Sequence, residues 1–296
     1  MPTPMRRCPR RSAPVGDQEW HQGVAPYPRS LIELADAPKT VFTRGRADVL
    51  DRPVVAVVGT RRSTPYGERV ARAVATVLAR AGVCVVSGLA FGIDTVAHEA
   101  ALEVDGATCA VLATGVDVVY PRAHARVQAA IAERGLLVTE YRAGTDARRW
   151  SFPQRNRLIA GLACAVVVVE AGQRSGALVT AEIASDLGRD VAAVPGPIDA
   201  PQSQGTNALI RDGATMITDA MDVLVLAGMT AVKRAVPPKL RGDEATVWRA
   251  LAPGRIDTDT LAVQSRLPTP RCLAALTALE LAGLVTGASD GTYARA

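Results

Sequence analysis

Short apolar runs and helical stretches alternate along the chain from residue 54 onward. Each run is followed by a loop rich in Gly, Ser and Thr, and then by a segment with apolar residues at helical spacing. The runs occupy residues 54–58, 83–86, 109–112, 136–138, 165–169 and 191–194, with a shorter one at 215–217. They are apolar throughout rather than alternating, which is typical of strands covered on both faces. We therefore predict buried strands.

The segments between these runs predict helices. In residues 67–81, four apolar side chains share one helical face, because Val70, Val74, Val77 and Leu78 fall at i, i+4, i+7 and i+8. The other helices are predicted at 95–104, 122–133, 155–162, 177–187 and 206–211. Strands that alternate with helices indicate an α/β fold with a doubly wound, mostly parallel sheet. Its ligand site is expected beyond the carboxyl ends of the strands.

The composition changes at both ends of this repeating region. Residues 1–28 are rich in Pro and Arg without periodicity, and we predict a disordered leader there. The α/β domain is predicted over 29–230, followed by a Pro- and Lys-containing linker at 231–242. Helical stretches at 244–251, 258–264 and 270–282 then precede two short strands around a Ser-Asp-Gly turn. Three helices and a terminal hairpin indicate a winged-helix-like domain over 243–296.

The composition and the charge exclude several classes of protein. With 48% apolar and 21% charged residues and a net charge of +5, most of the chain is not disordered. The longest apolar run, 162–169, is far shorter than the roughly 20 residues that a membrane span needs. No apolar stretch follows the basic N-terminal residues, so we expect no export signal and a cytoplasmic protein. Residues 15–232 hold 21 basic and 23 acidic residues, so an anion site there must be a local cluster.

Several loops next to the predicted strands carry arginines. Gly59-Thr-Arg-Arg follows the first strand, Phe152-Pro-Gln-Arg-Asn-Arg precedes the fifth and Gln173-Arg-Ser-Gly follows it. Glycines before a helix let an anion approach the backbone amides, and a row of guanidinium groups suits a polyanion. We therefore predict an anion site at one edge of the sheet, with Arg61, Arg62, Arg155, Arg157 and Arg174. The alternative for any single arginine is a helix cap or a structural ion pair.

The sequence offers little support for catalysis. No Ser-His-Asp arrangement or nucleophile elbow is visible, and the three histidines lack metal-ligand spacing. Asp94, Glu140 and Glu170 stand at strand or helix ends, where we expect them to orient arginines rather than to act as catalytic acids. We predict a protein without catalytic residues, metal or cofactor, and without a small-molecule substrate.

Six segments resemble the DprA/Smf family of bacterial DNA-processing proteins in order and spacing. They read VAVVGTRRSTPYG, SGLAFGIDTVAH, GVDVVYP, FPQRNRLIAGL, EAGQRSGALVTA and GTNALIRDGA. The resemblance implies an extended Rossmann-like domain with a winged-helix appendage. It also implies a non-enzymatic protein that binds and protects single-stranded DNA, helps to load the RecA recombinase and forms a homodimer through the Rossmann-like domain.

The resemblance implies DNA contacts above all for Arg61 and Arg157. Further members of the implied site are Gly59, Thr60, Ser87, Gly88, Arg155, Asn156, Arg174, Ser175 and Gly176. Position 91 is Phe where many relatives carry Arg or another residue, so this chain lacks the phosphate contact that an arginine there could make. For a dimer interface the sequence offers Asn207, Ile210 and Met216, late in the series of strands, with Leu209 between them as core or interface.

Two enzymatic alternatives remain. A nucleotide-binding or nucleotide-hydrolysing enzyme on a related Rossmann-like fold would carry a Pro-Gly-Gly-x-Gly-Thr loop. The nearest match here is Pro195-Gly-Pro-Ile, with Gly205-Thr206 further along, so that loop is not reproduced. An NAD-dependent enzyme is disfavoured because the G-x-G-x-x-G fingerprint is missing.

Overall fold

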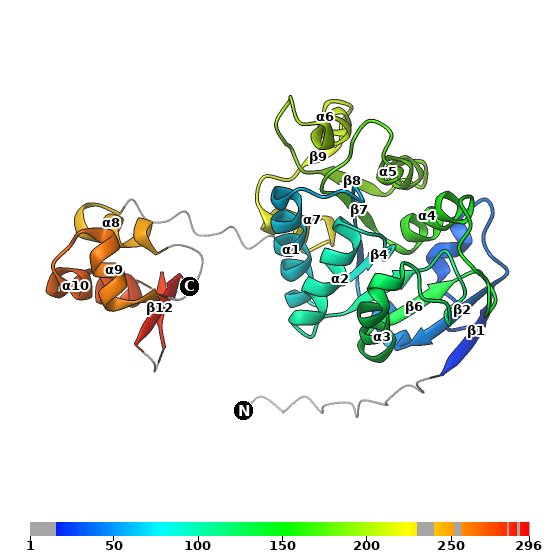
Figure 1. The fold of residues 1–296 in the computed structure, drawn as a ribbon, viewed down its shortest axis with the longest axis horizontal. Coiled ribbons are helices and arrows are strands. Elements are labelled where there is room, and N and C mark those ends of the chain that lie inside the picture. Colours follow the sequence, from blue (N-terminus) through cyan, green and yellow to red (C-terminus); the bar gives the residue numbers. More distant parts are fainter. Residues whose placement is uncertain (1–15, 230–239, 252–255, 283, 289–290, 296) are drawn as a thin grey trace, which may run out of the picture. The chain divides into compact units, whose positions relative to one another are not determined.

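The computed structural model describes residues 16–229, 240–251, 256–282, 284–288 and 291–295. The chain forms two compact units, residues 1–231 and 232–296 (Figure 1). Within the described residues, no helix combines the length and the apolar character that crossing a membrane requires.

A nine-stranded sheet is the centre of the first unit, in the order β1-β2-β6-β5-β4-β3-β7-β8-β9. All neighbours from β6 to β9 pair in parallel, whereas β1 and β2 pair antiparallel at one edge. This confirms the predicted mostly parallel α/β fold. The strands are β1 Asp17–His21, β2 Thr40–Gly45, β3 Val54–Val58, β4 Cys84–Ser87, β5 Thr108–Val111, β6 Leu136–Thr139, β7 Ala165–Val168, β8 Asp190–Ala193 and β9 Thr215–Met216.

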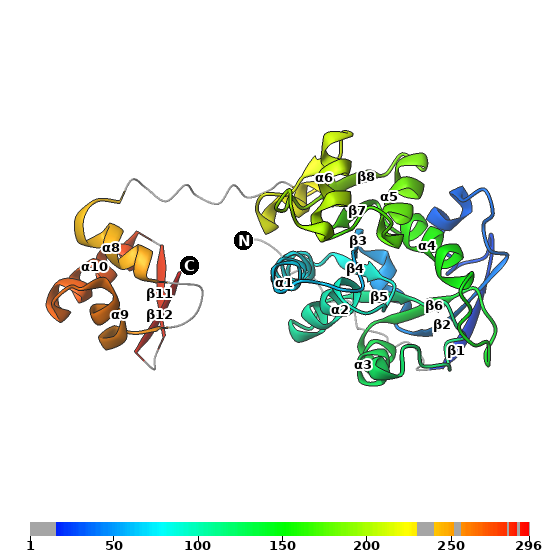
Figure 2. The same cartoon turned by 45° about the horizontal axis from the view of Figure 1, so that its top comes forward.

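Helices cover both faces of this sheet (Figure 2). Val55 and Val57 of β3 pack with α1, α2 and α7 on one face, while Val54, Ala56 and Val58 pack with α4 and α5 on the other. The two-sided burial explains why the strand sequences are continuously apolar. The helices are α1 Pro65–Arg80, α2 Ile93–Glu103, α3 Ala125–Arg134, α4 Ser151–Leu162, α5 Gly176–Asp186, α6 Gln204–Arg211 and α7 Val223–Leu226. Short 3₁₀ turns are η1 Arg29–Glu33, η2 Ala47–Asp51, η3 Arg122–His124, η4 Pro201–Ser203 and η5 Ala220–Asp222.

The N-terminal region differs from the sequence prediction. Residues 1–15 of the predicted leader lie outside the described residues, but residues 16–28 are not disordered as predicted. They include β1, which pairs with β2 along its whole length and buries Trp20 at 3% exposure. The prediction failed because β1 is polar except for Trp20, so it has no apolar run that marks a buried strand. Its hydrogen bonds come from pairing with β2, about 20 residues further along the chain.

The second unit has the helices and the strands of a winged helix. Its elements are α8 Gly242–Ala250, β10 Ile256–Asp257, α9 Thr258–Ser265, α10 Thr269–Leu281, β11 Val285–Gly287 and β12 Thr292–Arg295, with strand order β10-β12-β11. Val247, Leu261, Leu276 and Leu279 form its small core. Residues 231–239 of the predicted linker lie outside the described residues.

The connections that leave β3 and β7 diverge to opposite faces of the sheet. From β3 the chain enters α1 on one face, and from the adjacent β7 it enters α5 on the other. This divergence opens a crevice at the carboxyl ends of the two strands, which is where open α/β sheets bind their ligands.

Candidate nucleic-acid interface

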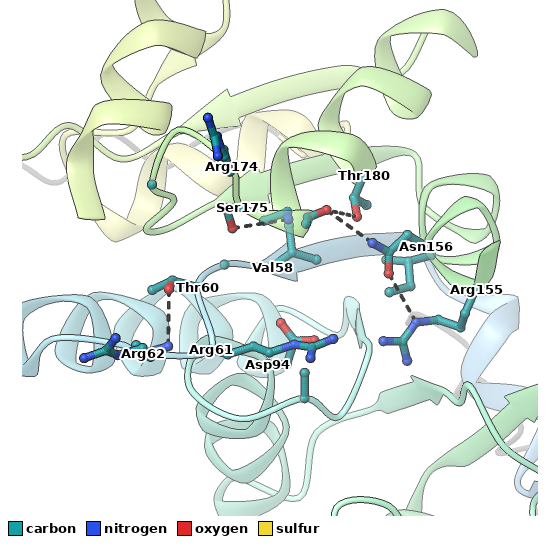
Figure 3. Close-up of a pocket in the computed structure, with 16 residues that line it drawn as sticks. Val58, Thr60, Arg61, Arg62, Asp94, Arg155, Asn156, Arg174, Ser175 and Thr180 are labelled. Atoms are coloured by element: carbon teal, nitrogen blue, oxygen red, sulfur yellow. Dashed lines mark hydrogen bonds between the residues drawn. The ribbon is translucent and has the colours of Figure 1, made fainter. Parts of the chain in front are cut away.

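A cavity of about 390 Å³ occupies this crevice (Figure 3). Its walls come from four segments that are distant in sequence: the loop after β3, the start of α2, the first turns of α4 and the loop after β7. Among its lining residues are Thr60, Arg61, Arg62, Asp94, Arg155, Asn156, Arg174 and Ser175. The sequence-predicted loops therefore meet at one place.

Close backbone packing fixes the loop after β3. A Cβ at Gly59 would lie 2.5 Å from Ile93 Cγ1 and 2.9 Å from the carbonyl oxygen of Glu170. The Thr60 amide donates to that same carbonyl at 2.7 Å. The buried Glu170 carboxylate accepts from the amide and the hydroxyl of Thr64, the N-cap of α1. Glu170 thus holds the loop and the start of α1, rather than an arginine as we predicted.

Three arginines at this cavity have exposed guanidinium groups. Arg61, Arg62 and Arg174 are exposed, and no ion pair engages them in the part of the chain that the structure describes. Arg61 lies over the ring of Phe152, 4.9 Å from its centroid, which is within the range of a cation–π contact. Phe152 was not among the predicted site residues, although it opens the same arginine-bearing segment. Unpaired guanidinium groups at a cavity are available to bind an anion.

The start of α5 adds a second source of positive potential. Ser175 is the N-cap of α5 and its hydroxyl accepts from the Ala177 amide at 3.4 Å. Asn156 donates from Nδ2 to the carbonyl oxygen of Gly176 at 3.2 Å, so α4 fixes the start of α5. Arg174 immediately precedes this helix start. The partial positive charge of a helix N-terminus beside a guanidinium group favours anions at this wall.

Arg155 lines the cavity but has a structural role. It is 3% exposed, and its Nη1 donates to the carbonyl oxygens of Gly88, at 2.6 Å, and of Val111. Burial lowers the pKa of Arg155 to about 10, so the group stays charged near neutral pH. Burial also raises the pKa of Asp94, an effect that the nearby Arg155 charge opposes. Arg155 therefore joins the carboxyl ends of β4 and β5 and leaves little of its surface for a ligand.

Ser87 and Gly88 also belong to the close packing around Arg155 at the end of β4. Ser87 is fully buried and its hydroxyl donates to the Val57 carbonyl at 2.7 Å, so it is not at the surface. A Cβ at Gly88 would meet Arg155 Nη2 at 2.5 Å and Asp94 Oδ2 at 2.8 Å. Both residues position the site without presenting a side chain to it.

Arg157 is not brought to the cavity. Its side chain is buried against two carboxylates, with Nη2 2.6 Å from Glu140 Oε2 and Nε 2.7 Å from Asp36 Oδ2. Burial raises the pKa of Glu140, and the Arg157 charge opposes that rise. Arg157 thus forms a structural ion pair, which was the alternative to a phosphate contact. The structure offers no support for the predicted phosphate contact.

Loss of this ion pair is expected to destabilise the fold. Arg157→Ala leaves Glu140, which is 11% exposed, as an unpaired buried carboxyl group. Removing one partner of a buried pair costs about 3 kcal/mol of unfolding free energy. Urea denaturation of the variant measures this loss. The double variant Arg157→Met with Glu140→Leu should recover most of it, and equal stability of Arg157→Ala and wild type would contradict the assignment.

The three predicted interface residues lie on α6 and β9. The side-chain amide of Asn207 forms two hydrogen bonds with the backbone of Gly196. Its Oδ1 accepts from the Gly196 amide at 3.1 Å, and its Nδ2 donates to the Gly196 carbonyl oxygen at 3.0 Å. Ile210 is half-buried, and Met216 is 50% exposed on the edge strand β9. Leu209 packs against the core. Asn207 thus stabilises the fold of its own chain, and the interface stays a prediction for Ile210 and Met216.

Within the described residues, no group of three or more His, Cys, Asp or Glu side chains is placed to hold a metal ion.

Comparisons with known proteins match both units. Residues 21–228 match the family model of DNA recombination-mediator protein A, and residues 231–291 match the DprA winged helix domain. Protein Smf of Escherichia coli is 39% identical over 280 residues, which cover 91% of this chain and 75% of Smf. The putative DNA processing protein DprA of Mycobacterium tuberculosis is 46% identical over 248 residues, which cover 81% of this chain and 64% of that protein.

Two solved structures agree with the fold. DNA processing protein A from Streptococcus pneumoniae superposes with a TM-score of 0.67 at 43% identity, covering 70% of this chain and 73% of the other. DNA processing protein A from Helicobacter pylori, whose structure concerns its single-stranded DNA binding mode, gives a TM-score of 0.66 at 30% identity, covering 72% of this chain and 97% of the other. The family model spans most of this chain, and the chain belongs to the DNA recombination-mediator protein A family.

Proposed function

We propose that this protein binds single-stranded DNA at the cavity between β3 and β7 and acts in the cytoplasm as a non-enzymatic recombination mediator that helps to load RecA. One observation supports the DNA-binding part: around one cavity, beside the N-terminus of α5, Arg61, Arg62 and Arg174 have no ion-pair partner among the described residues. The single-stranded DNA binding of the Helicobacter pylori relative supports the choice of polyanion.

The buried acids do not favour the enzymatic alternative. Asp94 accepts from the Gly88 amide at 3.1 Å and Glu170 is engaged by Thr64, so both are committed to local structure. Glu140 is paired with Arg157 outside the cavity. A general acid or base needs an available proton site within reach of its substrate. We infer that the site binds rather than hydrolyses.

A binding experiment separates these two functions. Fluorescence anisotropy with a 30-nucleotide oligo(dT), a duplex of the same length and nucleoside monophosphates is measured at two salt concentrations. We expect tight binding of the single strand that weakens with salt by about 0.7 log units per log unit for each phosphate contacted. Release of base or phosphate from a monophosphate, or failure to bind the single strand, would contradict the proposal. RecA loading is tested by filament formation on a strand already coated with single-strand-binding protein.

We expect the C-terminal unit to bind duplex DNA weakly. Winged helices read duplex through their third helix, which normally presents several basic residues. Here Arg271 on α10 is paired with Asp243 at 2.7 Å, and Glu280 follows on the same helix. Leu281, which is 85% exposed, suits a protein contact better. Gel-shift titration of residues 240–296 with duplex at physiological salt checks this, and submicromolar binding would refute it.

A further inference from the structure

Aromatic side chains lie next to the arginine cavity, the cavity lined by Arg61, Arg62 and Arg174. The chain has 11 aromatic residues among 296, and three of them, Phe91, Tyr120 and Phe152, line a small pocket that shares Arg61 and Arg155 with this cavity. Tyr120 packs on Phe152 with ring centroids 5.4 Å apart, and Phe152 in turn lies under Arg61. Trp150, two residues before Phe152, packs edge-on against Tyr141 at 6.0 Å and 73°. Tyr141 is tied to α4 by its hydroxyl, which donates to Gln154 at 3.2 Å.

Trp150 is not a core residue. It is 54% exposed, although a large apolar ring normally contributes most when it is buried. It also occupies the N-cap position of α4 and makes no capping hydrogen bond there, where Ser, Thr, Asp or Asn would stabilise the helix. The fold therefore gains little from this side chain. An exposed residue that breaks a local rule without structural benefit is a candidate for binding.

The loop that leads to Trp150 is basic. Arg142, Arg148 and Arg149 are exposed, and none of them takes part in an ion pair among the residues that the structure describes. Asp146 is the acidic residue of this loop, so residues 141–150 carry a net charge of +2. Aromatic rings beside unpaired cations form the usual platform for unpaired nucleobases, because the rings stack on bases while the cations face the backbone.

We propose that Trp150, supported edge-on by Tyr141, is a stacking site for an unpaired nucleobase of the strand whose phosphates bind at the arginine cavity. This inference rests on the proposed function. It gives the path of the DNA strand over the protein: from the cavity the strand passes over the start of α4 and along residues 141–150. It also assigns a substrate preference, because a base paired within a duplex cannot place its face on the indole ring.

Oligonucleotides with and without bases test the stacking site. The full-length protein, Trp150→Ala and Trp150→Phe are titrated with a fluorescent 12-nucleotide oligo(dT) and with a strand of the same length made of abasic residues. Stacking on an aromatic side chain is worth about 1–3 kcal/mol per base, so Trp150→Ala should bind oligo(dT) about tenfold more weakly. The same variant should bind the abasic strand as wild type does, and Trp150→Phe should keep most of the affinity for oligo(dT).

Two outcomes would overturn the inference. Unchanged oligo(dT) binding by Trp150→Ala would leave the exposed ring for a protein partner, and an equal loss on both strands would make its role structural. The variant Arg61→Ala shows whether a negative result concerns the stacking site alone or DNA binding at the cavity as a whole. If Arg61→Ala weakens both strands and Trp150→Ala weakens neither, the cavity binds DNA and the stacking site is wrong. If wild type binds neither strand, the proposed function itself fails.

Discussion

Arg61→Glu is expected to weaken single-stranded DNA binding by at least about a hundredfold. Arg61 is exposed at the cavity, lacks a carboxylate partner within the described ranges and lies over the ring of Phe152. A charge-assisted hydrogen bond to phosphate is worth about 1.5–3 kcal/mol, so Arg61→Ala alone should cost about ten- to a hundredfold. The glutamate adds repulsion between like charges. Anisotropy titrations over a series of salt concentrations measure both the affinity and its salt slope.

The salt slope and two control variants make this result specific. Loss of one phosphate contact should lower the slope by about 0.7 in Arg61→Ala. Arg80→Glu carries the same charge change at the exposed far end of α1 and should bind as wild type. Arg157→Ala, measured well below its melting temperature, should keep both affinity and slope. Wild-type binding by Arg61→Glu, or a lowered slope in Arg157→Ala, would show that the cavity arginines are assigned wrongly.

The parallel part of the sheet could be predicted because the burial of its strands leaves a pattern in the local sequence. Strands β3 to β7 are buried along their whole length, and burial on both faces requires continuous apolar runs that are visible in the sequence. By contrast, β2 alternates between half-buried and buried residues, and β1 buries Trp20 among polar neighbours. Both strands depend on pairing with partners distant in sequence, which no local pattern records.

The position of the site could be predicted, but the direction of its side chains could not. Loops after parallel strands gather at one edge, so the cavity follows from topology. Arg155 and Arg157 were counted with the loop segment 152–157, and the predicted helix began only at residue 155, whereas α4 begins at Ser151 and contains both side chains. Successive residues of a helix turn by about 100°, so two arginines two positions apart point to opposite sides of α4. One therefore faces the ends of β4 and β5, and the other faces Glu140.

We propose that two copies of the chain associate through α6 and the edge strand β9. A single cavity of 390 Å³ with three free arginines holds only a short stretch of strand. Linking two such cavities makes the second engagement intramolecular and raises avidity by about 10²–10⁴. β9 pairs with β8 and is the last strand of the sheet that the described residues form, and Met216 on it is half-exposed. Unlike Leu209, Ile210 belongs to none of the core clusters formed by the described residues.

Ile210→Glu is therefore expected to give a folded monomer. Its affinity for a 40-nucleotide strand should fall about a hundredfold, because avidity is lost, whereas binding of a six-nucleotide strand that fills one cavity should stay unchanged. Val225→Glu, a matched substitution at a 58% exposed position on α7, should remain dimeric. Sedimentation velocity at micromolar concentration measures the assembly of each variant. A monomeric wild type would refute the dimer, whereas a dimeric Ile210→Glu with full affinity for the long strand would refute this interface alone.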